Sequence, residues 1–186
     1  MNKISLVGVE DGSFDAFDRE SNDKTLLSMV QMYESVITGL ELRYVKVDGL
    51  DATEKLLNML TGINSKAILL GGVSFAGFNV IDAKLVNNET GIPLIVFSGK
   101  KPNMASVKDA LIRHFPDWRE RWRIIESLGN IYSATIKKWN QPIYFEAIGI
   151  SPENALEILN MSIIVSRVPE PIRVAGLIAK GLFRAG

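Results

Sequence analysis

Four carboxylates stand at or just beyond the ends of predicted strands. Glu10 and Asp11 close a short apolar run, and Asp48 and Asp51 follow a longer one. Carboxylate oxygens are preferred ligands of Mg²⁺ and Mn²⁺, and enzymes that cut phosphodiesters commonly hold two such ions about 3.5 to 4 Å apart. The sequence thus makes Glu10 and Asp51 candidate catalytic residues, and Glu10, Asp11 and Asp51 candidate metal ligands.

These carboxylates also have simpler interpretations. Successive strand residues point to opposite faces, so Glu10 and Asp11 cannot both face one ion while the strand stays regular. Asp51 precedes Glu54 by three residues, the spacing of a helix-capping box, and Asp11-Gly12 is a common turn pair. The acidic stretch over residues 11–23 is expected to be an exposed loop.

A glycine-rich segment runs from Gly71 to Gly77. Its glycine spacing resembles a phosphate-binding loop, but Phe78-Asn79 replaces the lysine and hydroxyl residue that such a loop requires. The sequence therefore argues against hydrolysis of nucleoside triphosphates. Because glycines remove side-chain bulk, Gly71, Gly72 and Gly77 remain candidates for close contact with a nucleic-acid base or backbone.

Basic residues gather between positions 100 and 123, close to two tryptophans. They are Lys100, Lys101, Lys108, Arg113, Arg119, Arg121 and Arg123. On a helix Trp118 and Trp122 lie together, where they either pack inward or form a platform on which bases stack. The arginines equally fit a solvated helix face. The single histidine, His114, stands at a predicted helix end, where a solvated cation complements the helix dipole.

Apolar patterning predicts three strands first and then alternating helices and strands. The expected strands cover residues 4–9, 26–33, 36–47, 67–70, 93–97 and 143–148. The expected helices cover 51–62, a segment between 77 and 89, 104–114, 117–128, 151–161 and the end of the chain after 169–171. Antiparallel strands followed by parallel crossovers indicate an α/β, ribonuclease H-like mixed sheet flanked by helices, in one domain over residues 1–186.

Composition narrows the possible functions. The 21 basic and 21 acidic residues cancel, so attraction to nucleic acid has to come from a local patch. The absence of cysteine excludes disulfides, thiolate zinc sites and cysteine nucleophiles, and one histidine excludes sites that need two imidazoles. The N-terminal apolar run is short and no stretch of 18 apolar residues occurs, so we expect a soluble, cytoplasmic protein with no membrane partner.

Four segments in order resemble one protein family. They are GVEDGSF, VDGLDATEKL, LLGGVSFAGFNVID and PEPIRVAGLIAKG. Together they resemble the archaeal domain-of-unknown-function family ninety-nine, which is related to endonuclease V, and the resemblance runs over nearly the whole chain. It implies an endonuclease V-like fold, Mg²⁺ or Mn²⁺ as cofactor, and DNA or RNA that contains inosine, the product of adenine deamination, as substrate.

The metal-binding positions of endonuclease V are only partly acidic in this chain. By the resemblance, its first-strand aspartate falls on Glu10 and its first-helix glutamate on Asp51. The aspartate that follows the fourth strand falls on Gly71, and the aspartate of the final helix falls on Gly176. Its histidine falls on Ile150. The acidic set is therefore incomplete.

The resemblance also places Lys100 near a phosphate-contacting lysine, and the wedge that endonuclease V uses to expose the base is absent. We therefore expect a nucleic-acid-binding protein with a degenerate metal site and weak or no nuclease activity, whose groove is lined by Gly71 to Gly77 and Lys100 and takes single-stranded DNA or RNA. One alternative is a metal-dependent endonuclease for inosine-containing DNA or RNA that uses the four strand-end carboxylates. Another is a protein-interaction domain. The sequence does not predict the oligomeric state.

Overall fold

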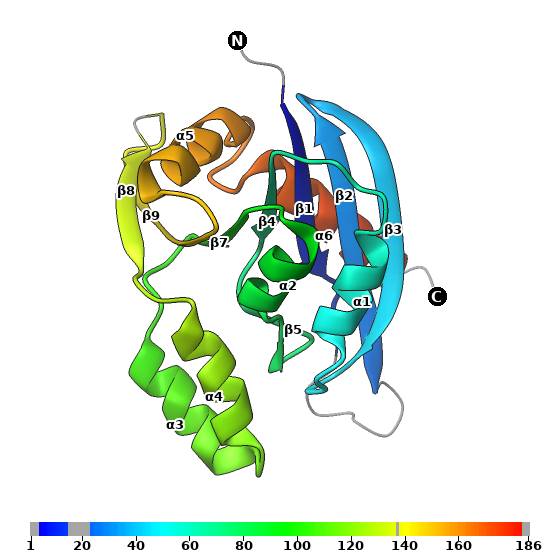
Figure 1. The fold of residues 1–186 in the computed structure, drawn as a ribbon, viewed down its shortest axis with the longest axis vertical. Coiled ribbons are helices and arrows are strands. Elements are labelled where there is room, and N and C mark those ends of the chain that lie inside the picture. The colour runs from blue at the N-terminus through cyan, green and yellow to red at the C-terminus, as the bar shows by residue number, and fades with distance from the viewer. Residues whose placement is uncertain (1–3, 15–22, 137, 184–186) are drawn as a thin grey trace.

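The computed structural model describes residues 4–14, 23–136 and 138–183, with a seven-stranded sheet between two layers of helices (Figure 1). The sheet has the order β3-β2-β1-β4-β7-β9-β8. Its strands are β1 (Ser5–Asp11), β2 (Lys24–Tyr33), β3 (Val36–Lys46), β4 (Ala67–Leu70), β7 (Leu94–Ser98), β8 (Tyr132–Ile136) and β9 (Gln141–Ile148). The helices are α1 (Ala52–Met59), α2 (Ala83–Thr90), α3 (Met104–His114), α4 (Trp118–Ser127), α5 (Pro152–Ser162) and α6 (Glu170–Phe183). A separate hairpin pairs β5 (Ser74–Phe75) with β6 (Asn79–Val80).

Three central strands set the position of the functional site. Strands β1, β4 and β7 run parallel, and β2, β3, β9 and β8 extend the sheet through antiparallel pairs. The parallel crossovers bring the carboxyl ends of β1, β4 and β7, at Asp11, Leu70 and Ser98, to one edge of the sheet. In open α/β sheets, ligands bind at this edge.

Alternate residues of β1 enter two different cores, as the strand period of two requires. Val7 and Val9 pack with α1 and α2, whereas Leu6 packs with α5 and α6. Gly8 and Glu10 share the face of Leu6 and so point toward α6. The direction of the Glu10 side chain therefore follows from the register of β1.

Helix α6 lies directly on β1 and β2. The closest approach is at Gly8, where a Cβ would lie 2.1 Å from the carbonyl carbon of Pro171 and 2.5 Å from the backbone nitrogen of Ile172. Only a residue without a side chain fits there. This contact seats the start of α6 and brings Gly176, further along the helix, over Glu10.

The predicted elements are confirmed within a few residues, with three exceptions. Strand β8 was missed, because its first four residues alternate between intermediate and exposed positions and only its last, Ile136, is buried. The glycine-rich segment contains the β5–β6 hairpin, with Phe75 buried. For that reason α2 begins only at Ala83, after Asp82 Oδ1 accepts from the Leu85 N–H at 2.9 Å. The loop expected over residues 11–23 lies largely, at 15–22, outside the described residues.

Helices α3 and α4 form a hairpin that projects beyond the sheet in the lower part of Figure 1. A small cluster that includes Val80, Leu111 and Ile125 joins this hairpin to β6. Among the helices of the described ranges, none combines the length and the apolar content needed to cross a membrane.

Candidate functional site

Glu10 lies at the carboxyl edge of the sheet, between β4 and α6. Its side chain fills the space beside two glycines. A Cβ on Gly71 would lie 2.1 Å from Glu10 Oε2, and a Cβ on Gly176 would lie 2.9 Å from Glu10 Cγ. These are the two positions at which the resemblance to endonuclease V places aspartates. With Glu10 in this position, a side chain at either glycine requires the Glu10 side chain to move.

Glu10 and Asp11 form a pair of carboxyl groups. The Asp11 N–H donates to Glu10 Oε1 at 3.3 Å. Burial, and next the charge of Asp11, raise the pKa of Glu10 to about 8, whereas the charge of Lys180 opposes the rise. Their other contacts lie on opposite faces of β1, since Glu10 packs against Gly176 of α6 whereas Asp11 accepts from Ala76, which packs in the core with α1 and α2.

Asp11 also ties this pair to the glycine-rich segment. Its Oδ2 accepts from the Ala76 N–H at 2.5 Å, and the Ala76 carbonyl accepts from the Asp48 N–H at 2.8 Å. Asp48 Oδ1 accepts from the Phe78 N–H at 2.9 Å. Two of the four strand-end carboxylates thus hold the β5–β6 hairpin in place.

The three glycines predicted to contact nucleic acid have different surroundings. Gly71 and Gly72 follow β4 at the edge of the sheet, and Gly71 lies beside Glu10. Gly77 has φ 83° and packs against Asp48, where a Cβ would come within 2.3 Å of Oδ1. Gly77 therefore serves the turn between β5 and β6, and the open backbone beside Glu10 is that of Gly71 and Gly72.

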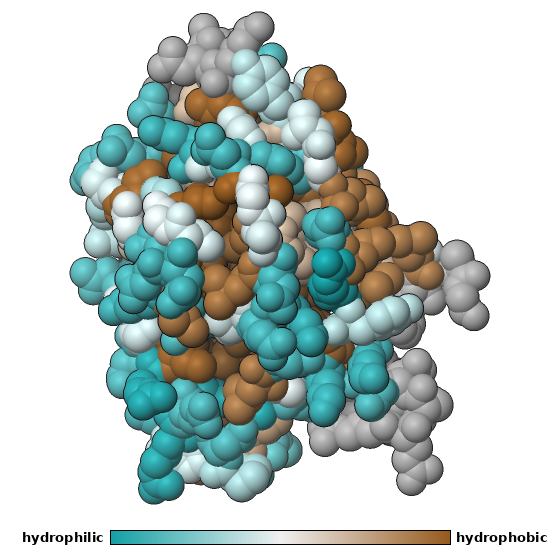
Figure 2. Space-filling view, turned by 45° about the vertical axis from the view of Figure 1, so that its right-hand side comes forward, coloured by the Kyte–Doolittle hydropathy of each residue, from teal (hydrophilic) through white to brown (hydrophobic). Residues whose placement is uncertain are grey.

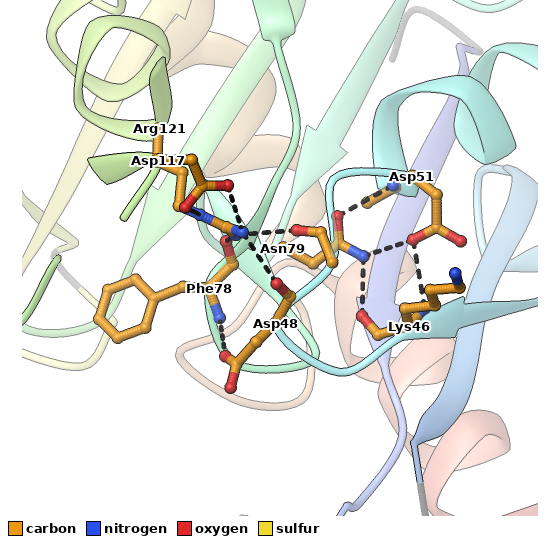
Figure 3. A network of polar contacts seen from close by, with 9 residues as sticks. Lys46, Asp48, Asp51, Phe78, Asn79, Asp117 and Arg121 are labelled. Atoms are coloured by element: carbon orange, nitrogen blue, oxygen red, sulfur yellow. Dashed lines mark hydrogen bonds and ion pairs between the residues drawn. The ribbon is translucent and has the colours of Figure 1, made fainter. Parts of the chain in front are cut away.

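Asp51 belongs to a second polar network (Figure 3). Its Oδ1 accepts from the Lys46 N–H at 3.2 Å and from Asn79 Nδ2 at 2.7 Å. Asn79 Oδ1 accepts from the Ala52 N–H at 3.0 Å, so Asn79 and not Asp51 satisfies the first turn of α1. The capping-box prediction for Asp51 is wrong, because the acceptor comes from β6.

Arg121 is the centre of this second network. Its guanidinium donates to both carboxylate oxygens of Asp117, at 3.0 and 2.8 Å, and to the carbonyls of Gly49, Phe78 and Asp48, at 2.8, 2.6 and 2.9 Å. Every N–H of the group therefore has an acceptor. The hydrogen bond from Arg121 also holds the pKa of the Asp117 carboxyl below its usual value. Arg121 joins α4 to the corner between β3 and α1.

An Arg121→Lys variant is expected to lose about 2 to 4 kcal/mol of unfolding free energy. Lysine keeps the charge but cannot reach three carbonyls and a carboxylate at once, so buried acceptors are left unpaired. Urea unfolding measures the loss. Arg123→Lys, an exchange of an exposed arginine two residues away, is the control and is expected to change stability by less than about 0.5 kcal/mol. Equal effects of the two exchanges would contradict a structural role for Arg121.

The basic group of residues 100–123 divides in two. Arg121 is buried, whereas Lys100, Arg113 and the other members are partly or fully exposed. Trp118 and Trp122 pack against the α3–α4 cluster, which confirms the packing interpretation. Cations cover their outer faces, since Arg119 lies 4.6 Å from the Trp118 ring and Lys108 lies 4.7 Å from the Trp122 ring.

Lys100 and His114 lie at opposite ends of the segment that contains α3. Lys100 is exposed just beyond β7, on the same edge of the sheet as Glu10. His114 is exposed in the last turn of α3, which confirms the predicted solvated position. Of the two, only Lys100 lies at the edge that carries the candidate site.

Glu10 opens toward solvent in a pocket of about 240 Å³ along α6. The pocket is also lined by Val168, Ile172, Arg173, Gly176, Leu177 and Lys180. Arg173 forms an ion pair with Glu170 at 2.5 Å. Because Glu170 balances the charge of Arg173, Lys180 supplies the net positive charge beside Glu10, an arrangement that suits a phosphodiester next to Glu10. The sequence prediction missed both cations, although the PEPIRVAGLIAKG segment contains them.

The acidic residues fit one divalent cation better than two. Over residues 4–14, 23–136 and 138–183, no three Asp, Glu or His side chains lie close enough to bind one ion together. Glu10, Asp11 and Asp51 are therefore not assembled into a single ligand set. Glu10 and Asp11 alone provide two adjacent carboxylates, a donor set that Mg²⁺ or Mn²⁺ completes with water and phosphate oxygens.

A further buried carboxyl group, Glu146 of β9, was not predicted. It is 6% exposed and pairs with Val96 of β7, and burial raises its pKa to about 7. Glu146 shares a face with Ile148, which packs in the core with α1 and α2. It therefore points away from the face that carries Glu10 and is not part of the candidate site.

Comparison with known proteins identifies relatives over the whole chain. The family model described as Endonuclease dU matches residues 2–183. A UPF0215 protein of Methanothermobacter thermautotrophicus is 37% identical, and the match covers 97% of this chain and 88% of that protein. A protein of unknown function from Archaeoglobus fulgidus has the same fold, with a TM-score of 0.84, 30% identity, and coverage of 97% of this chain and 98% of that one.

The fold extends to endonuclease V. The Ciona intestinalis enzyme, solved with an inosine-containing DNA, aligns with a TM-score of 0.63 at 14% identity, over 99% of this chain and 87% of that one. This match confirms the predicted ribonuclease H-like architecture. The family carries the description Endonuclease dU in place of the domain-of-unknown-function label that the sequence motifs suggested, and the similarity to endonuclease V is one of fold.

Proposed function

The chain belongs to the Endonuclease dU family, and from this we propose that it binds nucleic acid and cuts it slowly beside a deaminated base, with one divalent cation at Glu10 and Asp11. The observation that carries the proposal is the position of the Glu10 carboxyl, between Gly71 and Gly176 at the carboxyl edge of the sheet. The family description indicates deoxyuridine as the deaminated nucleotide, and inosine is the alternative suggested by the endonuclease V fold.

The residues of the site support this activity in distinct ways. Glu10 and Asp11 would hold Mg²⁺ or Mn²⁺, which supplies positive charge next to the phosphate that is cut. Arg173 and Lys180 line the same pocket and are placed to contact phosphate oxygens. Next to Gly71, the partly exposed Gly72 has no side chain to hinder approach of the nucleic acid.

The rate of cleavage is expected to be low because the site contains few carboxylates that could hold metal ions. Two-metal nucleases stabilise both the attacking and the leaving oxygen, and they need more carboxylates than Glu10 and Asp11 provide. The pKa of Glu10, at about 8, adds a second restriction, since a cation has to displace the proton that Glu10 retains near neutral pH. Cation binding and cleavage are therefore both expected to strengthen as the pH rises.

Oligonucleotides that contain one deoxyuridine, one inosine or no altered base test the proposal. Fluorescence anisotropy over a series of salt concentrations is expected to show binding with a negative salt slope, because phosphate contacts release counterions. With Mn²⁺ or Mg²⁺, slow cleavage beside the deaminated nucleotide is expected, and a chelator is expected to abolish it. Absence of binding at low salt to both single- and double-stranded forms would contradict the proposal.

A second candidate is a nucleic-acid-binding protein that does not cut. It is favoured by one observation, namely that the described residues contain no group of three carboxylates able to hold an ion. The same assay separates the two candidates. Salt-dependent binding without cleavage, under both cations and at pH 9, supports the second candidate and excludes the first.

A further inference from the structure

Strand β3 forms a long edge of the sheet. Within the part of the chain that the structure describes, its only neighbour in the sheet is β2, whereas the strand at the opposite edge, β8, has five residues. Five of the fourteen large hydrophobic side chains that are exposed in the described residues lie on β3 or beside it: Tyr33, Val36, Ile37, Leu40 and Tyr44. Figure 2, which turns this side of the molecule forward, shows hydrophobic surface along its right-hand side. An edge of this length and composition favours pairing with another strand.

The hydrogen bonds of β3 determine which of its backbone groups face outward. The Val47 N–H donates to the Asp23 carbonyl at 2.7 Å, in the register that pairs Lys46 with Lys24. Because inward bonding alternates along an antiparallel pair, the odd-numbered residues of β3 from 39 to 45 bond to β2, and the even-numbered residues from 40 to 46 present N–H and C=O groups outward. The Leu42 carbonyl agrees with this pattern, since it accepts from the Arg43 side chain at 2.8 Å.

We propose that β3 pairs antiparallel with β3 of a second copy of this chain, with a two-fold axis at Leu42. In this register Leu42 faces Leu42 of the other copy, and Leu40 faces Tyr44. These are even-numbered residues, so their outward N–H and C=O groups form the new hydrogen bonds. At the axis the Leu42 carbonyl exchanges the Arg43 side chain, from which it accepts in the single chain, for the N–H of Leu42 in the other copy. The dimer joins two seven-stranded sheets into one continuous sheet and covers the exposed Leu40 and Tyr44, which are 46% and 65% exposed in the single chain.

Charge complementarity supports a second copy as the partner. The same register places Glu41 of each copy opposite Arg43 of the other, at a non-hydrogen-bonded pair, where opposed side chains are closest. Within one chain these two residues already form an ion pair at 2.8 Å. A two-fold axis at Glu41 or at Arg43 would instead set like charges against each other, so the charges favour the axis at Leu42.

Charge exchange tests this dimer. The wild-type chain is expected to sediment and scatter light at twice the 20.6 kDa chain mass. Glu41→Arg and Arg43→Glu each place like charges opposite one another twice across the axis, and each is expected to weaken dimerisation at least about tenfold. An equimolar mixture of the two variants is expected to form a heterodimer, because every position 41 then faces an opposite charge at position 43. The double variant is expected to form a homodimer for the same reason.

The controls separate the interface from the fold. Circular dichroism and thermal unfolding are expected to be unchanged in both single variants, because Arg43 is exposed and Glu41 is partly exposed. The proposal is overturned if the wild-type chain is monomeric at the highest attainable concentration. It is also overturned if the wild type is dimeric but the single variants remain so, or if the mixture of two folded monomeric variants stays monomeric.

Discussion

A Glu10→Gln variant is expected to lose at least about 100-fold in the rate of cation-dependent cleavage while it keeps its affinity for DNA. Glutamine has the size of glutamate but cannot supply the negative charge that holds a divalent cation beside Asp11. The amide adds no repulsion toward phosphate, so anisotropy is expected to give a dissociation constant equal to or below that of the wild type. Single-turnover cleavage of the deoxyuridine oligonucleotide measures the rate.

The matched control is Glu54→Gln, an exchange at a side chain that is 70% exposed on α1. It is expected to leave both cleavage and binding unchanged. Cleavage by Glu10→Gln at the wild-type rate would show that the carboxyl group of Glu10 is not used.

Stability provides a second readout for the same variant, measured in metal-free buffer. Since the folded-state pKa of Glu10 is raised from 4.5 to about 8, the folded protein keeps a proton that the unfolded chain has released between these values. The unfolding free energy therefore falls as the pH rises through this interval. Glu146, with its pKa raised to about 7, adds to the fall only up to that pH. The unfolding free energy of the wild type is expected to fall between pH 7 and pH 9. In Glu10→Gln the fall over the same interval is expected to be smaller by about 1 kcal/mol, a value that allows for partial solvent screening.

A Gly8→Ala variant is expected to lose about 3 kcal/mol or more of unfolding free energy. The added methyl group would lie 2.1 Å from the Pro171 carbonyl carbon and 2.3 Å from its oxygen, so α6 has to move away from β1 as a unit. Displacement of α6 also shifts Gly176 away from Glu10, so weaker nucleic-acid binding is expected with the loss of stability. Urea unfolding and anisotropy measure the two effects.

Gly181→Ala is the control for Gly8→Ala. Gly181 lies in α6, the helix that packs on Gly8, and a Cβ at Gly181 would have no atom within 4 Å. Because alanine favours a helix over glycine by about 0.5 to 1 kcal/mol, this variant is expected to be as stable as the wild type or slightly more stable. Equal stability of the two alanine variants would contradict the close packing of β1 against α6.

The fold could be predicted from the sequence because apolar residues recur at different spacings in its strands and in its helices. The central strands, such as Ala67–Leu70, are buried on both faces and stand out as apolar runs. Strand β8 lacks such a run, since only Ile136 of its residues is buried. The hairpin of β5 and β6 was hidden by its glycines, whose turn chemistry indicates a loop but does not indicate that Phe75 enters the core.

The candidate site was only partly predictable, because contacts distant in the sequence decide its chemistry. Glu10 could be identified from its place at the end of the first strand. Asp51 does not cap α1, because its carboxylate accepts from Asn79, which is distant in the sequence. Arg121 is buried because its guanidinium donates to carbonyls more than 40 residues away in the chain, such as that of Phe78. No local pattern contains such pairings. The helical spacing of the arginines therefore predicted a solvated position for Arg121, which is buried in the structure.

The fit of Glu10 between Gly71 and Gly176 bears on how such a centre can be altered. An aspartate introduced at Gly71 would meet the carboxyl end of Glu10, and one at Gly176 would meet Glu10 Cγ, so in either variant the Glu10 side chain has to turn aside. A shorter acid at position 10 would withdraw from both glycines. The three positions therefore share one space, and a change at one of them alters how a side chain fits at the other two.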